Sequence, residues 1–87
     1  MNGADILIKG LQDRGVEFIS ILCGNGTEAI ITSAHEAGLR MVDTRNEQAA
    51  SYLAEAYAKL TRKIGVCVVS SAIAHVNATA GMMNAWF

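Results

Sequence analysis

Two kinds of apolar pattern alternate along this chain. Mostly apolar runs at residues 16–23, 39–43 and 64–69 have the length and composition of buried strands. Between them apolar residues recur every three or four positions, most clearly over residues 46–60, as in helices with one buried face. The pattern predicts three strands and four helices, with helices over residues 3–14, 27–37, 46–60 and 74–87.

Helix-end signals agree with these boundaries. Asn2 is placed to cap the first helix, and Gly15 and Gly38 are placed to end the first and second. Strands that alternate with helices imply parallel strands joined by right-handed crossovers, with both faces of the sheet covered. We therefore expect an α/β fold: a three-layer arrangement of a parallel sheet with flanking helices.

The composition is unusually apolar for a short chain. Of 87 residues, 52% are hydrophobic and 17% charged, and the chain ends in Met82, Met83, Trp86 and Phe87 without a polar stop. A three-stranded parallel sheet is also small and open-edged. We expect residues 1–87 to be a truncated part of a larger domain, or a chain that associates through apolar surface.

Charge and cysteine content exclude several classes of function. A formal net charge of −1 gives no electrostatic basis for binding nucleic acid or an anionic membrane. Residues 64–87 carry no charge, but scattered polar residues favour a buried strand and helix over a membrane span. Cys23 and Cys67 lack metal-ligand spacing and lie in apolar runs, so we interpret them as reduced, small hydrophobic residues of a cytoplasmic protein.

A glycine-rich loop follows the first predicted strand. The sequence Gly24-Asn25-Gly26-Thr27-Glu28-Ala29 matches a relaxed dinucleotide-binding fingerprint, and Asp43 stands near the place of a ribose-binding acid. Glu28 would put negative charge where a pyrophosphate would lie, and a whole helix precedes the first strand. A Rossmann-like nucleotide-binding module remains an alternative, and so does an ordinary tight turn.

The most informative acid is Glu47, in the first turn of the third predicted helix. Thr44-x-x-Glu47 matches a capping box, in which the two side chains satisfy backbone N–H groups at the helix start. The same carboxylate follows a strand of an α/β sheet, at the edge where such folds bind ligands. Glu47 is therefore either a capping acid or a proton-transfer group.

Several segments in order resemble the N-terminal pyrimidine-binding domain of thiamine-diphosphate enzymes, most closely the acetolactate synthase group. They are GADILIKGLQDRGVEFI, CGNGTEAI, AGLRMVDTRNEQAASYLAEAYAKLTRKIGVCVVSS and HVNATAGMMNA. The resemblance covers nearly the whole chain, but only about the first half of that domain. Its most specific part runs from Arg45 to Lys63, where the family has Arg-His-Glu, Gly-Tyr-Ala-Arg and Thr-Gly-Lys.

The resemblance implies a catalytic role for Glu47, as the acid that hydrogen-bonds a ring nitrogen of the cofactor's aminopyrimidine. A buried, apolar surround would raise the pKa of Glu47 and suit it to proton exchange near neutrality. Further cofactor-binding candidates by this resemblance come from two loops and two helix starts: Cys23, Gly24, Asn25, Gly26, Gln48, Ala72, Ile73 and Asn77. Ala72-Ile73-Ala74 replace the family's Gly-Pro-Gly, and an alanine at position 72 would crowd the cofactor or require a backbone angle that alanine disfavours.

The resemblance also implies cofactors and partners. The cofactor would be thiamine diphosphate, with magnesium held by a second domain whose Gly-Asp-Gly motif is absent here, so this chain would supply no metal ligand. The substrate would be a 2-oxo acid, with carboligation, decarboxylation and oxidation all open, and the enzyme a homo-oligomer or a pairing with a diphosphate-binding domain. By itself the chain would bind the cofactor poorly and be inactive. A third alternative is a non-catalytic fragment that acts only in assembly.

Overall fold

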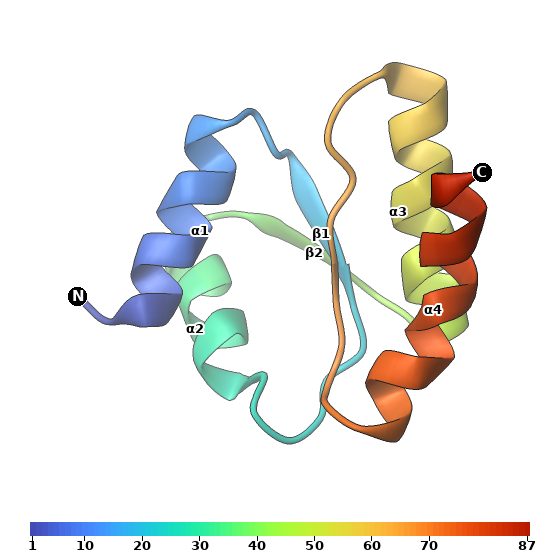
Figure 1. Cartoon of the computed structure of the whole chain (residues 1–87). Helices are drawn as coiled ribbons and strands as arrows, with labels where there is room; N and C mark the ends of the chain where they lie inside the picture. Colours follow the sequence, from blue (N-terminus) through green and yellow to red (C-terminus); the bar gives the residue numbers. More distant parts are fainter.

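Helices and strands alternate through the whole chain. The computed structural model describes residues 1–87 (Figure 1). The elements are α1 (Gly3–Asp13), β1 (Phe18–Ile21), α2 (Glu28–Glu36), β2 (Arg40–Asp43), α3 (Glu47–Thr61), β3 (Cys67–Val68) and α4 (Ile73–Trp86). The predicted α/β class is confirmed, with three strands and four helices. The strands are shorter than predicted, because only the segments that pair with β1 form a ladder.

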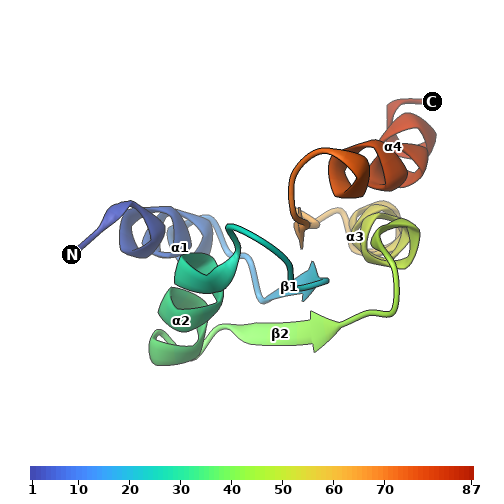
Figure 2. The ribbon, with the colours of Figure 1, turned by 90° about the horizontal axis from the view of Figure 1, so that it is seen from below.

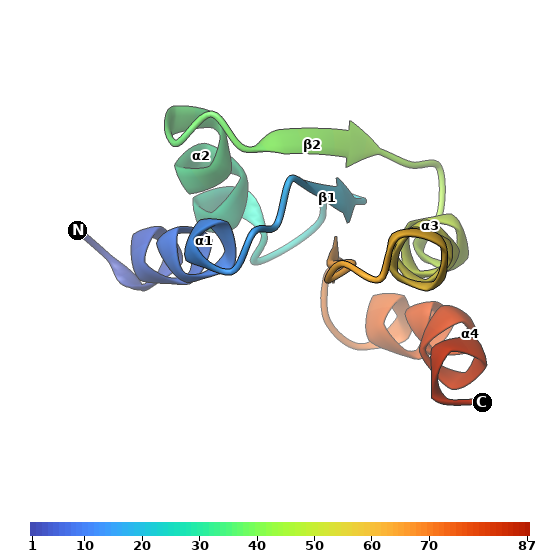
Figure 3. The same cartoon turned by 90° about the horizontal axis from the view of Figure 1, so that it is seen from above.

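The sheet is parallel, with the order β2-β1-β3. Figures 2 and 3 show α1 and α2 together on one side of the sheet and α3 on the other. The last helix, α4, packs against α3. Because all three strands run the same way, their carboxyl ends, and the loops that follow them, lie along one edge of the sheet.

Strand β1 separates two different packing environments. Ile19 and Ile21 point into the apolar core beneath α1 and α2, which also contains Ile8, Val16, Ala34 and Leu39. Phe18 and Ser20 point the other way, towards α3. The Phe18 ring meets the Tyr57 ring edge-on with centroids 4.8 Å apart. The buried Ser20 hydroxyl donates to the carbonyl of Ala50 at 2.7 Å.

Small residues allow α3 to approach both the sheet and α4 closely. A Cβ added to Gly65 would overlap the backbone of Ala54 in α3, and one added to Gly81 in α4 would overlap Ser51. The N–H of Gly81 donates to the Ser51 hydroxyl at 3.2 Å. The position of α4 on α3 therefore depends on the contact between Gly81 and Ser51.

The helix-end predictions for α1 and α2 are confirmed. Asn2 and Asp5 form a reciprocal capping box, with hydrogen bonds of 2.9 and 3.0 Å. Gly15 and Gly38 follow the two helices with φ of +82° and +75°, a conformation that favours glycine.

Much apolar surface is exposed. Ile6 of α1 is 62% exposed, because α1 contacts the core through Ile8 and Leu11. Large apolar side chains are also exposed along α3 and α4: Tyr52, Leu60, Ile73, Val76, Met82, Met83 and Trp86. No helix has the length and hydrophobicity needed to cross a bilayer.

Candidate functional site

The predicted site residues lie in the segments that follow the carboxyl ends of the strands. Cys23 to Gly26 form the loop after β1, Glu47 and Gln48 begin α3 after β2, and Ala72 and Ile73 join β3 to α4. In Figure 1 these segments lie along the lower part of the molecule. One edge of the sheet thus carries all of them.

Glu47 is the first residue of α3, and its side chain is not needed to cap the helix. The predicted Thr44–Glu47 capping box is wrong: Asn46 is the N-cap, and its side-chain oxygen accepts from the N–H of Ala49 at 2.8 Å. Thr44 is still bound to the sheet, because its N–H donates to the carbonyl of Ile21 at 2.9 Å. The Glu47 carboxylate is therefore available for other contacts.

Glu47, Gln48 and Asn77 form a hydrogen-bonded cluster between α3 and α4. The Asn77 amide Nδ2 donates to Glu47 Oε1 at 2.7 Å. Gln48 Nε2 donates to Asn77 Oδ1 at 3.1 Å. The second carboxylate oxygen, Oε2, has no partner in a neighbouring residue. Three of the predicted residues are thus brought together, and one oxygen of the acid has no partner in another residue.

The pKa of Glu47 lies below its ordinary value of 4.5. The bond from Asn77 is the main cause, followed by the residue's own backbone N–H, and burial, the smallest of the three contributions, opposes both. The expected upward shift is therefore wrong for this chain, since Glu47 is only half-buried. At neutral pH the side chain is a carboxylate.

The glycine loop satisfies its own backbone. The Thr27 hydroxyl accepts from the N–H of Gly24 at 3.0 Å and donates to its carbonyl at 2.8 Å. The Glu28 carboxylate accepts from the N–H of Gly26 at 3.1 Å. The N–H groups of Gly24 and Gly26, two of those that could hold a phosphate in a dinucleotide site, are thus occupied by the loop's own side chains. This arrangement argues against the nucleotide-binding alternative.

Two shallow pockets flank this loop. One, of about 300 Å³, is lined by Asn25, Gly26, Thr27, Ile30, Val69, Ser70 and Ser71. The other, of about 320 Å³, is mostly apolar and is lined by Ile21, Cys23, Ile31, Met41 and Asp43. Neither pocket is lined by Glu47. Cys23, expected to be a small hydrophobic residue within a strand, instead follows β1 and is exposed.

Ala72 has a backbone conformation that alanine disfavours. Its φ of +56° and ψ of −119° fall in a region populated mainly by glycine. The expectation that alanine here requires an unfavourable angle is confirmed. Ile73, the next residue, begins α4 and is 84% exposed.

Two contacts around the site were not predicted. Ser70 Oγ donates to the carbonyl of Asn25 at 2.8 Å and joins the loops that follow β1 and β3. A Cβ on Gly24 would press on the Ser70 side chain, which explains the glycine there. The sequence signal that could have predicted these contacts was a serine directly after the third predicted strand, because that strand end lies beside the glycine loop after the first strand.

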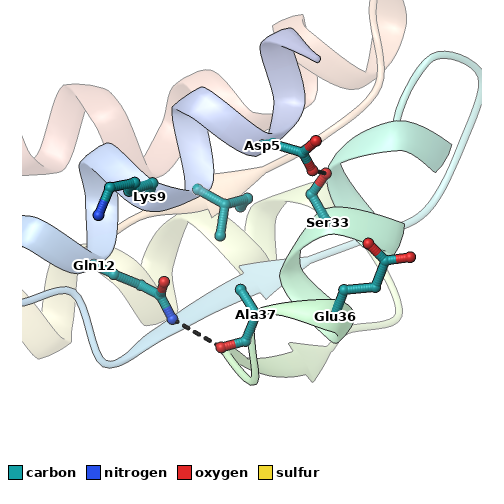
Figure 4. Close-up of a pocket in the computed structure, with 7 residues that line it drawn as sticks. Asp5, Lys9, Gln12, Ser33, Glu36 and Ala37 are labelled. Atoms are coloured by element: carbon teal, nitrogen blue, oxygen red, sulfur yellow. Dashed lines mark hydrogen bonds between the residues drawn. The ribbon is translucent and has the colours of Figure 1, made fainter. Parts of the chain in front are cut away.

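A further pocket lies between α1 and α2 (Figure 4). It has a volume of about 330 Å³ and is lined by Asp5, Ile8, Lys9, Gln12, Ser33, Glu36 and Ala37. Ser33 donates to Asp5 at 2.6 Å, and Gln12 donates to the carbonyl of Ala37 at 3.1 Å. These bonds join the two helices, and none of the predicted site residues lines the pocket.

Comparison with known proteins agrees with the sequence resemblance. The family described as "Thiamine pyrophosphate enzyme, N-terminal TPP binding domain" matches residues 1–87. Human 2-hydroxyacyl-CoA lyase 1 is 36% identical over 85 residues, which are 98% of this chain and 15% of the lyase. The acetolactate synthase large subunit of Haemophilus influenzae is 32% identical over 87 residues, 99% of this chain and 15% of that subunit.

A probable acetolactate synthase large subunit of Methanococcus aeolicus is 34% identical over 98% of this chain and 14% of its own length. The chain thus spans about one seventh of the length of these relatives. The match covers the chain from end to end. The chain belongs to the family of thiamine pyrophosphate enzymes and corresponds to sequence from their N-terminal TPP-binding domain.

Proposed function

We propose that this domain binds the aminopyrimidine ring of thiamine diphosphate and that Glu47 is the acid that meets a ring nitrogen. The observation that carries the proposal is the state of its carboxylate. One oxygen is held by Asn77, while the other has no partner in another residue, at the sheet edge where α/β folds bind ligands. A ring nitrogen that carries a proton is a suitable partner for such an oxygen, because an ionised carboxylate only accepts hydrogen bonds.

The residues present fit the cofactor in chemical type. A carboxyl group can share a proton with a ring nitrogen, and amide groups beside it can complete the hydrogen bonding of a polar heterocycle. When bound, thiamine diphosphate supplies the electron-accepting ring needed to make or break a bond to a carbonyl carbon. The protein's part is to hold the pyrimidine and to exchange a proton at Glu47.

The remaining candidates have supporting parts in this proposal. Gln48 and Asn77 fix the Glu47 carboxylate. The loop of Cys23, Gly24, Asn25 and Gly26 borders the site from the end of β1. Ala72 and Ile73 border it from the start of α4, where their side chains replace a family Gly-Pro turn and narrow the space available.

For the substrate we propose a 2-oxo acid, with carbon–carbon bond formation or decarboxylation as the reaction. The acetolactate synthase relatives support this class. The human relative at 36% identity is named for 2-hydroxyacyl-CoA, so cleavage of a 2-hydroxyacyl-CoA is a second candidate. Both reactions change a bond at a carbon that bears oxygen, next to a carbonyl, and both would use Glu47 in the same way.

We further propose that a diphosphate-binding domain, on a partner subunit or elsewhere in the enzyme, holds the diphosphate and magnesium. Residues 1–87 alone would then bind the cofactor weakly and turn over no substrate. Steady release of carbon dioxide from pyruvate by purified residues 1–87 would contradict this part of the proposal.

The deciding experiment replaces Glu47 by glutamine in the enzyme that carries this domain. We expect loss of turnover with only partly weakened binding of thiamine diphosphate, because glutamine keeps the size but cannot exchange the proton. Glu55→Gln is the matched control, since Glu55 lies on the same helix two turns further on and bonds Asn84. Unchanged turnover in the Glu47 variant would refute the catalytic role and favour a purely assembly-related function.

The nucleotide-binding alternative has its own test. NAD⁺ added to the ¹⁵N-labelled chain should leave the amide resonances of Gly24, Gly26 and Asp43 unmoved, because the two glycine N–H groups are already bonded. Saturable shifts at these residues, lost in Asp43→Ala, would establish that alternative instead.

A further inference from the structure

Two asparagines of α4 reach glutamates of α3 in the same way. Asn77 Nδ2 donates to Glu47 Oε1, and two turns later Asn84 Nδ2 donates to Glu55 Oε1. The two carboxylates differ in their surroundings. Lys59 Nζ lies 3.0 Å from Glu55 Oε1, whereas no charged side chain contributes to the pKa shift of Glu47. The helix pair therefore holds one carboxylate that is paired with a cation and one that is not.

The polarity of the bonds at Asn77 is fixed by chemistry. An ionised carboxylate only accepts hydrogen bonds, so Asn77 must turn its amide nitrogen towards Glu47. Its amide oxygen then accepts from Gln48 Nε2 at 3.1 Å. Because Glu47 and Gln48 are neighbours in the chain, the three side chains close a ring that joins the starts of α3 and α4.

The position of this hydrogen-bonded ring is set by the packing of α4 against α3. The N–H of Gly81 donates to the Ser51 hydroxyl, which in turn donates to the carbonyl of Gln48 at 3.1 Å. Asn77 lies one turn before Gly81 on α4. The close contact that seats α4 on α3 therefore also sets the distance from Asn77 to Glu47.

The ring makes the two oxygens of Glu47 unequal. Oε1 accepts an N–H from Asn77, so a proton on Oε1 would compete with that bond, whereas no other residue bonds Oε2, which can carry the proton. We infer that Asn77 is a positioning residue, held in orientation by Gln48, that presents Oε2 of Glu47 as the oxygen that exchanges a proton with a bound ligand. The identity of that ligand, an aminopyrimidine, rests on the proposed function; the inequality of the oxygens does not.

Other titratable groups near Glu47 do not provide this effect. Asp43 and Arg45 precede α3, and His75 lies in the first turn of α4. None of them contributes to the pKa of Glu47, whose shift comes from Asn77, its own backbone N–H and burial. Removing the Asn77 amide therefore removes the largest cause of the shift.

The test is a pH titration of the 87-residue chain by NMR, following the ¹³C resonance of the Glu47 carboxyl. Wild type, Asn77→Leu and Asn84→Leu are compared; leucine is close to asparagine in size and cannot hydrogen-bond. We expect the midpoint for Glu47 to rise in Asn77→Leu and to stay in place in Asn84→Leu, which loses a bond of the same kind between the same helices. Equal midpoints in all three proteins would overturn the inference.

The wild-type protein provides a second measurement that needs no folded variant. The side-chain NH₂ resonances of Asn77 should titrate with the same midpoint as the Glu47 carboxyl, because the amide senses the loss of the carboxylate charge. Asn77 resonances that stay constant through that midpoint would also overturn the inference.

A ligand measurement separates this inference from the proposed function. Thiamine is added at millimolar concentration, and binding is followed at Glu47, with at least a several-fold weaker response expected in Asn77→Leu than in Asn84→Leu. Equal binding by the two variants would contradict the positioning role. Absence of binding in every protein, with the difference in titration intact, would count against the proposed function and leave the inequality of the oxygens supported.

Discussion

Replacing Ala72 by glycine is expected to stabilise this protein. Ala72 has φ +56° and ψ −119°, is exposed, and makes no side-chain contact in the apolar core. A non-glycine residue held in a sparsely populated backbone region costs about 1–3 kcal/mol. Glycine adds freedom to the unfolded chain, which reduces the gain by about 0.4–1 kcal/mol.

The difference predicts that Ala72→Gly raises the free energy of unfolding by about 0.5–2 kcal/mol. For a domain of this size, Tm would rise by roughly 3–12 °C. Urea denaturation followed by far-UV circular dichroism measures the change, provided that the m-value is the same in both proteins. A variant that is less stable than wild type would refute the reasoning, since it would show that the turn does not strain alanine.

Two further variants test whether the effect depends on the backbone angle. Ala56 is exposed in the interior of α3, so Ala56→Gly should lower the free energy of unfolding by about 0.5–1 kcal/mol. Arg62 ends α3 in the left-handed conformation, with φ +62° and ψ +18°. Arg62→Gly should therefore stabilise, and by less than Ala72→Gly, because the left-handed helical region is less costly for a side chain.

Three more outcomes are expected. Gly81→Ala should lower the free energy of unfolding by about 1–3 kcal/mol in urea denaturation, because its Cβ would overlap Ser51 and push α4 off α3. Bonds from Lys63 and Tyr57 hold the pKa of Glu17 below its ordinary value of 4.5. The ionised Glu17 therefore adds to the free energy of unfolding in full above pH 4.5, and this contribution is lost as the pH falls through the lowered pKa. Glu17→Gln should therefore lose less stability than wild type when acidified over that range. Iodoacetamide should alkylate exposed Cys23 faster than Cys67, whose thiol pKa is raised by burial, as peptide mass spectrometry would show.

Each of these has a matched control. Gly3→Ala places a Cβ in open space within α1 and should not destabilise; a loss equal to that of Gly81→Ala would show that any glycine replacement is harmful. Asp13→Asn alters an exposed ion pair and should leave the acid dependence as in wild type. Equal alkylation rates for the two cysteines would mean that the segment around Cys67 opens readily.

The sequence predicted the elements well, because burial on one face of a helix and throughout a short strand leaves a local pattern. It predicted the start of α3 to within one residue but assigned the cap to Thr44 instead of Asn46, since both are suitable capping residues. The sheet takes the group that the capping box requires: the Thr44 N–H, from which Glu47 would accept, donates instead to the carbonyl of Ile21, and Asn46 caps the helix. That bond joins residues far apart in sequence and leaves no local signal.

The same distinction applies to the candidate site. Glu47 stands out in the sequence because an acid follows a strand, but its pKa depends on Asn77, 30 residues away. A resemblance to a family can name both residues without giving the bond between them. The prediction of a raised pKa was wrong for this reason: it assumed burial and did not include an amide donor.

The lowered pKa of Glu47 limits what residues 1–87 can do alone. An acid that exchanges a proton near neutral pH is most effective when its pKa lies close to the working pH, and in this chain Glu47 is shifted away from it. Removing water from a carboxylate raises its pKa, so a partner surface or a bound ring that covers Glu47 would oppose the effect of Asn77. Ile73 and Val76, exposed at the start of α4, offer apolar surface for such a cover. Under the proposed function, this domain orients the carboxyl and the covering surface tunes its proton affinity, so the Glu47 midpoint should be higher in the enzyme that carries this domain than in the 87-residue chain.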